Sequence, residues 1–404
     1  MVIGIIGAGA SGMAAAIAAS RNKAAQVLLF ERQARVGRKL QATGNGRCNL
    51  TNLHICPENY HGEESSFARH SLDTFGVEKT LKWFQDLGLY VTAEASGRVY
   101  PYSDQANSVV DVLRFALQKP NIQLLTGFEV TKVKKIESGF QVEGAGQKYF
   151  CDRLIVACGG LAGTKLGGSI SGYQILKGFG HRITKLRPAL VQIKSDWNGC
   201  AGLKGVRANC HAAIYHDGNL HSQSKGELQF TEQGLSGPVI FEISRDVCQG
   251  SGSWVCRLDL LPDMTEEELL HELQRRRNGQ LLAEELLTGI LHNRLGRIVT
   301  AAAGIRLSQK IEDLSDESLH DVCRVAKSLE VELTEPLGMD AAQVTAGGAL
   351  TAQFDHTTMQ SALIPSLYAC GEVLDIDGDC GGYNLQWAWS SGIIAGANAA
   401  EVAL

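Results

Sequence analysis

A glycine-rich turn near the start of the chain constrains the fold more than any other feature. Gly7, Gly9 and Gly12 lie between an apolar run, 2–6, and an alanine-rich stretch, 10–20, which predict a strand and a helix. In such a turn one glycine permits the tight bend, one lets the backbone approach a pyrophosphate, and one lets helix and strand pack closely. The helix start also offers N–H groups and a positive dipole end to phosphates. The segment therefore predicts a dinucleotide-binding site.

The second strand of this unit ends in an acid. An apolar run over 26–30 leads into Glu31, whose carboxylate can accept hydrogen bonds from ribose hydroxyls. Strand, glycine turn, helix, strand and acid in this order predict a Rossmann-like βαβ unit. The motif by itself does not distinguish NAD from FAD.

Features at both ends of the chain favour the longer cofactor, FAD. Two basic residues, Arg38 and Lys39, precede the segment 43–49, a second turn rich in backbone N–H and cationic groups. Near the other end, 367–372 reads as a strand ending in glycine and acid, and 381–384 opens the last helix. A helix start at that point can stabilise negative charge on a reduced flavin ring.

The length and texture of the chain predict more than one structural unit. At 404 residues it exceeds the size at which a single hydrophobic core usually keeps growing. Strand patterns dominate from about 188, and the stretch 263–329 reads as helical throughout. We predict an α/β fold with a Rossmann-like FAD-binding domain of the glutathione-reductase type, formed by both chain ends, 1–187 and 346–404, a β-rich, barrel-like insert over 188–262 and 330–345, and a helical insert over 263–329. The insert is expected to cover the substrate side of the flavin and to set specificity.

Local signals place several elements inside this insert. Asp217 and Gly218 predict the turn of a β-hairpin. A helix is expected after Pro238, and Thr265 with Glu268 forms a possible capping box at the start of another.

Composition argues against several classes of function. The net charge of −5 gives no overall reason to bind nucleic acid or an anionic membrane, although a local basic patch stays open. Apolar stretches fall short of the ~20 residues that cross a bilayer, so a soluble, cytoplasmic protein is expected. The eleven cysteines are scattered without a C-x-x-C pair, and the histidines lack metal-ligand spacing. Reduced, mostly buried thiols and no metal are therefore expected.

Motifs spread over the whole chain resemble the BaiN, aminoacetone-oxidase and YhiN-like family of bacterial FAD-dependent oxidoreductases. They are GRCNxTN at 46–52, GRVYP at 97–101, GLSGP at 234–238, GExLD at 371–375 and GGYN at 381–384. The resemblance implies FAD held by a domain made from both chain ends. Two departures leave the substrate open: Asn45 stands where the family commonly has Gly, and Glu232 where it usually has His.

The residues predicted to bind FAD come from these motifs and from the strand ends between them. In chain order they are Gly7, Gly9, Ala10, Ser11, Gly12, Glu31, Arg32, Arg38, Lys39, Gly46, Arg47, Asn49, Val130, Gly159, Gly160, Gly371, Glu372, Gly382, Tyr383 and Asn384.

Catalytic candidates are fewer. Tyr383 or Glu232 is expected to act as the acid, with Tyr100 or Tyr102 as further possibilities, and Arg47 to contact the flavin or a substrate oxyanion. Tyr383 can instead simply pack on the ring, and Glu232 can instead serve the dipole of a helix that it begins.

Three reactions fit the resemblance. The first, which we favour, is reduction of an activated C=C bond in an organic substrate, as a bile-acid reductase in the family implies. The second is oxidation of a small amine by oxygen, and the third is reduction of uridine to dihydrouridine in 23S ribosomal RNA, implied through 384–391. We favour a reductase because an anionic Glu232 near the flavin would oppose an anionic oxygen adduct. A single dinucleotide fingerprint leaves transient docking of NAD(P)H or another donor as the source of electrons for a reductase.

The ribosomal RNA reaction would need phosphate contacts. Basic residues of the helical insert could supply them: Arg275, Arg276, Arg277, Arg294 and Arg297. A disulfide reductase is disfavoured, because Cys48 has no cysteine partner within the next five positions. The sequence leaves the oligomeric state open.

Overall fold

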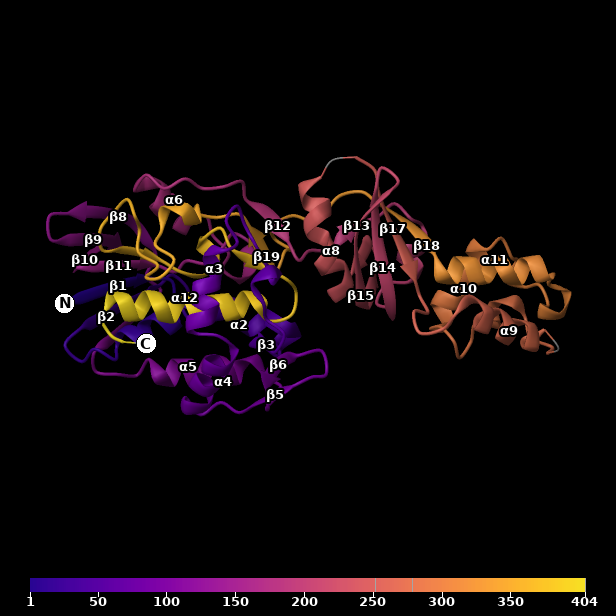
Figure 1. The fold of residues 1–404 in the computed structure, drawn as a ribbon, viewed down its shortest axis with the longest axis horizontal. Helices are drawn as coiled ribbons and strands as arrows, with labels where there is room; N and C mark the ends of the chain where they lie inside the picture. The colour runs from indigo at the N-terminus through magenta and orange to yellow at the C-terminus, as the bar shows by residue number, and fades with distance from the viewer. Residues whose placement is uncertain (251, 278, 404) are drawn as a thin grey trace. The chain divides into compact units, whose positions relative to one another are not determined.

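The structure is a computed structural model that describes residues 1–250, 252–277 and 279–403. The chain divides into two compact units, Met1–Arg187 with Gln343–Leu404, and Pro188–Ala342 (Figure 1). Each unit has its own hydrophobic core. The first unit is built from both ends of the chain, and the second is inserted between them.

A five-stranded parallel sheet forms the centre of the first unit. Its order is β20 (Leu367–Ala369), β11 (Arg153–Val156), β1 (Val2–Ile6), β2 (Gln26–Glu31) and β7 (Ile122–Thr126). Every neighbouring pair in this sheet is parallel. Parallel sheets are covered on both faces, so their strands are continuous apolar runs such as the four residues of β2 after Gln26. The predicted Rossmann-like fold is confirmed, and β20 brings the end of the chain into the sheet.

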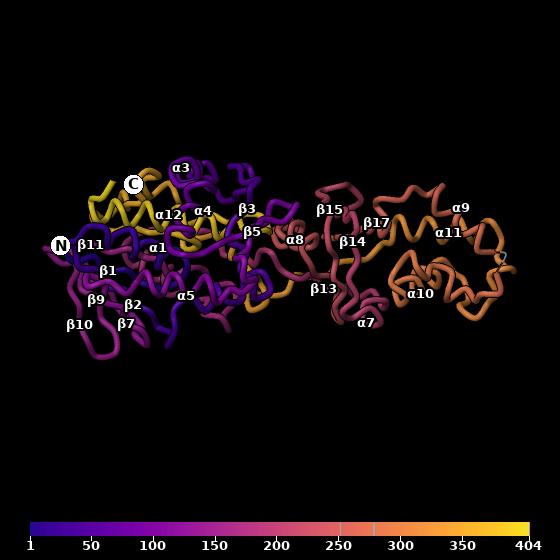
Figure 2. The backbone as a smooth tube through the Cα atoms, turned by 90° about the horizontal axis from the view of Figure 1, so that it is seen from below, coloured from indigo at the N-terminus to yellow at the C-terminus, as the bar shows by residue number. Residues whose placement is uncertain are grey.

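Two helices from opposite ends of the sequence pack directly on each other. They are α1 (Ala10–Ala19) and α12 (Tyr383–Ala399), which lie side by side in Figure 2. A Cβ on Gly392 would come within 2.4 Å of the Ser11 carbonyl oxygen, and one on Gly396 within 2.2 Å of the Ala15 carbonyl oxygen. Glycine and alanine therefore set how closely these helices approach.

The other elements of the first unit surround this sheet. The helices are α2 (Arg38–Ala42), α3 (Phe67–Thr74), α4 (Val77–Asp86), α5 (Ala106–Ala116) and α6 (Ser171–Gly178), and the strands are β3 (Thr51–Asn52), β4 (Tyr60–His61), β5 (Val91–Ala93), β6 (Arg98–Pro101), β8 (Val130–Ile136), β9 (Gly139–Gly144), β10 (Gln147–Cys151), β12 (Arg187–Ala189), β19 (Val344–Ala346) and β21 (Asp377–Gly378). Strands β8, β9 and β10 form an antiparallel sheet of their own.

The second unit contains a six-stranded antiparallel sheet. Its order is β13 (Ile193–Lys194), β16 (Gly234–Ser236), β15 (Asn219–Thr231), β14 (Arg207–His216), β17 (Trp254–Asp259) and β18 (Leu329–Leu333). The residues after β18 bond back to β13, with Lys194 N donating to Glu335 O at 2.8 Å and Thr334 N to Lys194 O at 2.9 Å. The sheet therefore closes on itself.

Local predictions in this unit hold at one turn and two helix starts. Asp217 and Gly218 both adopt positive φ, 47° and 85°, between β14 and β15, which is the expected hairpin turn. A short helix, α7 (Gly199–Gly202), precedes the hairpin, and α8 (Pro238–Gln249) starts at the predicted proline. The capping box is also present: Thr265 N donates to the Glu268 carboxylate at 2.8 Å, and Glu268 N to Thr265 Oγ1 at 3.1 Å.

The prediction of helix throughout 263–329 is wrong in part. The helices are α9 (Glu266–Arg276), α10 (Asn293–Ala302) and α11 (Asp316–Lys327), and irregular segments with short 3₁₀ turns separate them. Gly289 and Gly304 adopt positive φ, 81° and 80°, which interrupts the helical path. Leu286 and Leu287 reach the core from one of these irregular segments, whereas Leu281 and Leu282 are exposed, so the spacing of these leucines imitates a helical pattern.

The described ranges contain neither a candidate membrane-spanning helix nor a candidate metal site. No helix there is long and apolar enough to cross a membrane, and no three His, Cys, Asp or Glu side chains gather as a metal site. Every cysteine is a free thiol. Burial raises the pKa of Cys48 to about 12 and that of Cys158 to about 12, so both thiols stay protonated at neutral pH and are poor nucleophiles.

Candidate cofactor site

The glycine turn before α1 is tightly packed at Gly7 and Gly12 and open at Gly9. Gly7 has a φ of 104°, and a Cβ there would come within 2.4 Å of the Ala157 carbonyl oxygen. A Cβ on Gly12 would come within 1.8 Å of the Gly7 carbonyl oxygen, whereas one on Gly9 would meet no atom within 4 Å. Gly9 is also the N-cap of α1, where no side chain caps the helix. The turn thus offers open space and helix N–H groups, which fit a pyrophosphate.

Glu31 is oriented by the backbone on both sides. Ala8 N donates to its Oε2 at 2.8 Å, and Gln33 N donates to its Oε1 at 2.8 Å. A carboxylate oxygen has two lone pairs, so each oxygen keeps one for a ribose hydroxyl. Phe128 N donates to the Glu31 carbonyl oxygen at 2.9 Å, which brings the start of β8, and hence Val130, to the same edge of the sheet.

The basic residues after Glu31 are engaged within the chain. Arg32 donates to the carbonyl oxygens of Gly167 and Gly168 at 2.7 and 3.2 Å. Arg38 donates to Gln33 Oε1 at 3.0 Å. Arg32 therefore fixes a neighbouring loop, and contact of either side chain with FAD stays a prediction.

An ion pair joins the two ends of the chain. Lys39 Nζ lies 2.8 Å from Glu372 Oε2, and Glu372 Oε1 accepts from Thr345 N at 2.8 Å. A Cβ on Gly160 would come within 2.4 Å of Glu372 Oε1, so only glycine fits beside this carboxylate. Gly159, with a φ of 69°, borders open space. The predicted residues Lys39, Gly160 and Glu372 are thus brought together, and their bonds fasten α2 to the segment after β20.

The second glycine-rich turn has a left-handed backbone at its centre. Gly44 and Asn45 have φ values of 57° and 55°, and Gly46 has 86°. Asn45, the departure from the family pattern, is one of the few non-glycine residues that adopt this conformation at small cost, so the turn is kept. Asn49 Oδ1 is buried and has no hydrogen-bond partner among the described residues. An acceptor left in this state fits an N–H donor of a bound flavin.

Arg47 lies on the outer side of this turn. Its guanidinium stacks 3.9 Å from the centre of the Tyr100 ring. It pairs with Asp104, and with Glu94 at 3.1 Å, and the hydrogen bond to Asp104 raises the pKa of the guanidinium. Its charge is therefore already balanced by carboxylates, and a role at the flavin stays a prediction.

The start of α12 is uncapped and lies against the second turn. Gly382, its N-cap, has a φ of 105° and no side-chain cap, and a Cβ there would come within 2.5 Å of the Thr51 carbonyl group. Tyr60 Oη donates to Tyr383 O at 3.0 Å. The N–H groups of the first turn can face negative charge on the flavin pyrimidine ring. Gly371 also fits closely, since its Cβ would come within 2.5 Å of Ser11 Oγ.

The Asn384 amide is used within the protein. Its Oδ1 accepts from Gly378 N at 2.8 Å, and its Nδ2 donates to Gly378 O at 2.7 Å and to Asp379 O at 3.3 Å. The side chain therefore fixes the loop before α12. If Asn384 contacts FAD, it does so through its backbone.

The segment after Asn384 supports both cofactor loops from behind. Gln386 accepts from Thr51 Oγ1 at 2.6 Å, and its amide donates to Thr80 Oγ1 at 2.7 Å. Trp389 Nε1 donates to Leu50 O at 3.0 Å, and Trp387 Nε1 to Gly371 O at 3.2 Å. These residues are buried. The sequence analysis missed the structural role of these residues. The signal for it is a pair of polar residues, Gln386 and Ser390, that stand four positions apart inside an otherwise apolar helix.

Glu232 does not begin a helix. It lies in the turn between β15 and β16, and α8 starts only at Pro238, where the proline and the positive φ of Gly237 define the helix start. Its side chain is 65% exposed and pairs with Lys204 at 2.7 Å. The hydrogen bond from Lys204 lowers the pKa of Glu232, so the carboxylate is anionic at neutral pH. It cannot act as a proton donor in this state.

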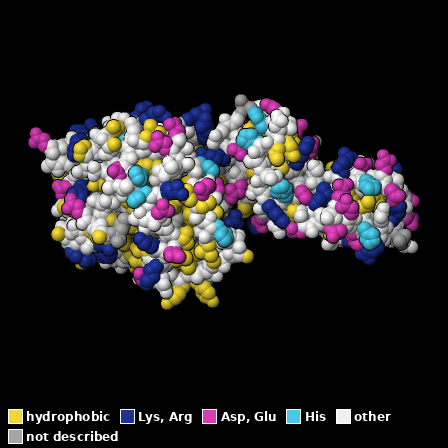
Figure 3. All heavy atoms as spheres, in the orientation of Figure 1, with side chains coloured by type: hydrophobic (Ala, Val, Ile, Leu, Met, Phe, Trp, Pro, Cys, Tyr) yellow, Lys and Arg dark blue, Asp and Glu magenta, His cyan; other side chains and the backbone are white. Residues whose placement is uncertain are grey.

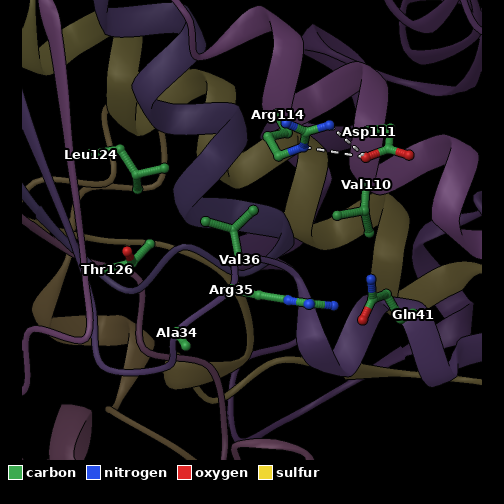
Figure 4. A pocket seen from close by; sticks show the side chains of 9 residues that line it. All are labelled: Ala34, Arg35, Val36, Gln41, Val110, Asp111, Arg114, Leu124 and Thr126. Carbon is green, nitrogen blue, oxygen red and sulfur yellow. Dashed lines mark hydrogen bonds and ion pairs between the residues drawn. The ribbon is translucent and has the colours of Figure 1, made fainter.

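A separate hollow of about 400 Å³ lies beside β7 and α5 (Figure 4). Val36, Val110 and Leu124 give it apolar walls, and Arg114 at its rim pairs with Asp111. None of the residues predicted to bind FAD lines it.

Comparison with known proteins agrees with this geometry. Residues 1–398 match the HI0933-like protein Rossmann domain. The chain is 39% identical to the 3-dehydro-bile acid delta(4,6)-reductase of Clostridium scindens, with 99% of each chain covered. It is 32% identical to the ribosomal RNA dihydrouridine synthase of Escherichia coli, with 96% of this chain and 95% of that protein covered.

Solved structures share the fold at low identity. A 3-ketosteroid delta1-dehydrogenase from Sterolibacterium denitrificans has a TM-score of 0.51 at 12% identity, with 99% of each chain covered. The FrdA subunit of E. coli quinol fumarate reductase has a TM-score of 0.51 at 18% identity, with 99% of this chain and 70% of that chain covered. The chain thus belongs to the HI0933-like family of Rossmann-fold, FAD-dependent oxidoreductases.

Proposed function

We propose that this enzyme reduces an activated C=C bond of an organic enone, with NAD(P)H as the electron donor. The observation that carries the proposal is the full-length similarity, at 39% identity, to a 3-dehydro-bile acid delta(4,6)-reductase. That name describes reduction of C=C bonds conjugated to a ketone. When bound, FAD supplies hydride transfer between donor and substrate.

In this proposal, groups of the protein bind the cofactor and stabilise the negative charge of its reduced ring. Gly9 and the start of α1 receive the pyrophosphate, and Glu31 receives the ribose. The uncapped start of α12 faces the negative charge of the reduced ring. Tyr383 remains a candidate acid, whereas the exposed, anionic carboxylate of Glu232 has no proton to give. Its negative charge is the one expected for a reductase, and its nearness to the flavin stays a prediction.

Reduction of uridine in ribosomal RNA is the second candidate. The relatives from Escherichia coli and Haemophilus influenzae, 32% and 29% identical, favour it because both are named ribosomal RNA dihydrouridine synthases. The arginines that would contact RNA phosphates argue against this reaction, because they already form ion pairs or hydrogen bonds within the protein. Arg275 and Arg276 pair with Glu272, and Arg277 with Asp316.

The two other arginines predicted to contact phosphate are engaged as well. Arg294 donates to backbone carbonyls, and Arg297 pairs with Glu284. Basic and acidic side chains are intermixed over the helical part on the face shown in Figure 3. Paired cations attract phosphate less strongly than an unpaired basic patch does. We therefore rank the enone first.

Half-reactions under anaerobic conditions test the proposal. Enzyme reduced with NADPH or NADH is mixed with an unsaturated steroid ketone, or with 23S ribosomal RNA lacking dihydrouridine, and flavin reoxidation is followed by absorbance. Rapid reoxidation by the ketone alone supports the proposal. Reoxidation by the RNA alone, weakened by salt, establishes the second candidate in its place. Reduction of the oxidised enzyme by aminoacetone, with rapid reoxidation in air, would reverse the direction of the reaction.

A further inference from the structure

A histidine and a carboxylate meet beside the start of α12. Strand β4 pairs antiparallel with β21, which places His61 opposite Asp377 and Tyr60 opposite Gly378. His61 Nε2 then lies 2.7 Å from Oδ1 of Asp379, the residue after β21. The two side chains are 33% and 29% exposed, so the pair is partly buried.

Asp379 is itself held in position. Its Oδ2 accepts from the Asn59 amide at 3.0 Å, and its backbone N donates to Asn59 O at 3.0 Å. An ionised carboxylate only accepts hydrogen bonds, so His61 Nε2 carries the hydrogen in this contact. Nδ1 of the same ring has no hydrogen-bond partner among the described residues. An imidazole oriented by a carboxylate, with its second nitrogen free, is the arrangement that proteins use for proton transfer.

The pair is fixed relative to the first turn of α12. The Asn384 amide bonds the backbone of Gly378 and Asp379, and Tyr60 Oη donates to Tyr383 O at 3.0 Å. Tyr60 and Tyr383 also contact each other edge to face, with ring centres 6.4 Å apart. His61 bonds Asp379, whose carbonyl oxygen accepts from the Asn384 amide at 3.3 Å, so the pair lies within hydrogen-bonding reach of the first turn of α12, at which the reactive ring of FAD is expected.

From this arrangement we propose that His61, oriented by Asp379, donates the proton that completes reduction of the C=C bond. The proposal rests on the proposed function. One carbon receives the hydride that NAD(P)H supplies by way of FAD, and the other carbon receives the Nδ1 proton of the imidazolium form of His61, in which Nε2–H stays bonded to Asp379. The neutral imidazole then regains a proton from water, so one donor molecule and one proton are consumed for each bond reduced. Imidazole titrates near neutral pH, which suits this role better than a phenol or an ionised carboxylate.

The experiment compares H61Q and D379N with wild-type holoenzyme, and H320Q, an exposed histidine on α11, serves as control. The first readout is binding of a substituted phenol to the oxidised enzyme, followed through the charge-transfer absorbance of phenolate against flavin. Phenol resembles the enol form of the substrate and must give its proton to a base on the protein. We expect H61Q to weaken this band and the phenol affinity at least tenfold, D379N to do so by less, and H320Q to change neither.

The second readout is stopped-flow kinetics. In H61Q we expect FAD content and reduction by NAD(P)H to stay within twofold of wild type, while reoxidation by the enone slows about 100-fold or more, the usual share of a general acid. Equal phenol binding and equal reoxidation in H61Q and wild type would overturn the role of His61. If wild type is not reoxidised by the enone and H61Q still loses phenolate binding, the enone proposal fails but the proton-bearing site stands.

Discussion

The two units of this protein are held together in opposite ways. In the cofactor unit, buried polar bonds join residues far apart in sequence, such as Thr51 to Gln386 across 335 positions and Leu50 to Trp389 across 339. On helix α9 of the insert the ion pairs are instead local, between Glu272 and the arginines three and four positions later. Long-range buried contacts bring catalytic parts together, whereas local ones contribute little beyond solubility and helix stability.

The strongest test of this contrast is the glycine turn. Gly12→Ala places a Cβ 1.8 Å from the Gly7 carbonyl oxygen and should cost about 3 kcal/mol of unfolding free energy or more, with loss of FAD. Gly9→Ala meets no atom within 4 Å and should leave the stability of the apoprotein nearly unchanged while weakening FAD binding. Urea unfolding of both apoproteins and FAD titration measure this. Equal destabilisation by the two changes would show that the turn is shaped differently.

A second test removes one buried hub. Gln386→Leu leaves Thr51 and Thr80 without their shared partner and should lower the free energy of unfolding by about 2–3 kcal/mol. The matched change in the insert is Gln274→Leu on α9, where the side chain is exposed, and it should alter stability by less than about 0.5 kcal/mol. Denaturant titrations decide between them. A similar loss of unfolding free energy in both variants would contradict the proposed difference between the two units.

The third test separates cofactor affinity from folding. Glu31→Ala removes an acceptor for ribose and should weaken FAD binding by about 1.5–3 kcal/mol, the order for a hydrogen bond to a charged group. Glu31→Gln keeps hydrogen-bonding capacity and should fall between alanine and wild type. Fluorescence titration of the apoproteins gives the dissociation constants. Unchanged affinity in the alanine variant would mean that the ribose lies elsewhere.

The smallest effect is expected in the insert. Hydrogen bonds from Arg275 and Arg276 lower the pKa of Glu272 to about 2. A carboxylate with a depressed pKa contributes stability above its unfolded pKa, and the contribution is lost as pH falls through the folded value. Glu272→Gln should therefore be slightly less stable than wild type at pH 7, and the difference should shrink from about pH 4 downward and at high salt. Urea unfolding at pH 7, 4 and 2.5 measures it, and a constant difference would assign the effect to packing.

Locally encoded features could be predicted from the sequence. The glycine turn, the Asp217–Gly218 hairpin and the Thr265 capping box each depend on residues within a few positions, and each is present. The helical stretch after α9 was overestimated, because leucines buried from irregular segments show the same spacing as a helix face. Glu232 was misplaced for a similar reason, since the helix it was assigned to begins at Pro238.

Contacts that depend on the fold could not be predicted in the same way. Lys39 and Glu372, or His61 and Asp379, are brought together only by strand order and by the packing of α12. Nothing in the local pattern of either partner identifies the other. The sequence therefore predicted the N-terminal and C-terminal parts of the candidate cofactor site separately. It did not predict the bonds that join the two parts.

The meeting of both chain ends also sets an order of events during synthesis. Strand β20 and helix α12 are translated after the whole of Pro188–Ala342 with its own core. At ~5–20 residues per second the ribosome takes roughly several seconds to add this final stretch. Until then the parallel sheet lacks an edge strand and α1 lacks the helix that covers it, so a nascent chain exposes apolar surface there. Chaperone binding to the growing polypeptide should therefore concentrate on the first unit, and FAD can be captured only after translation of α12.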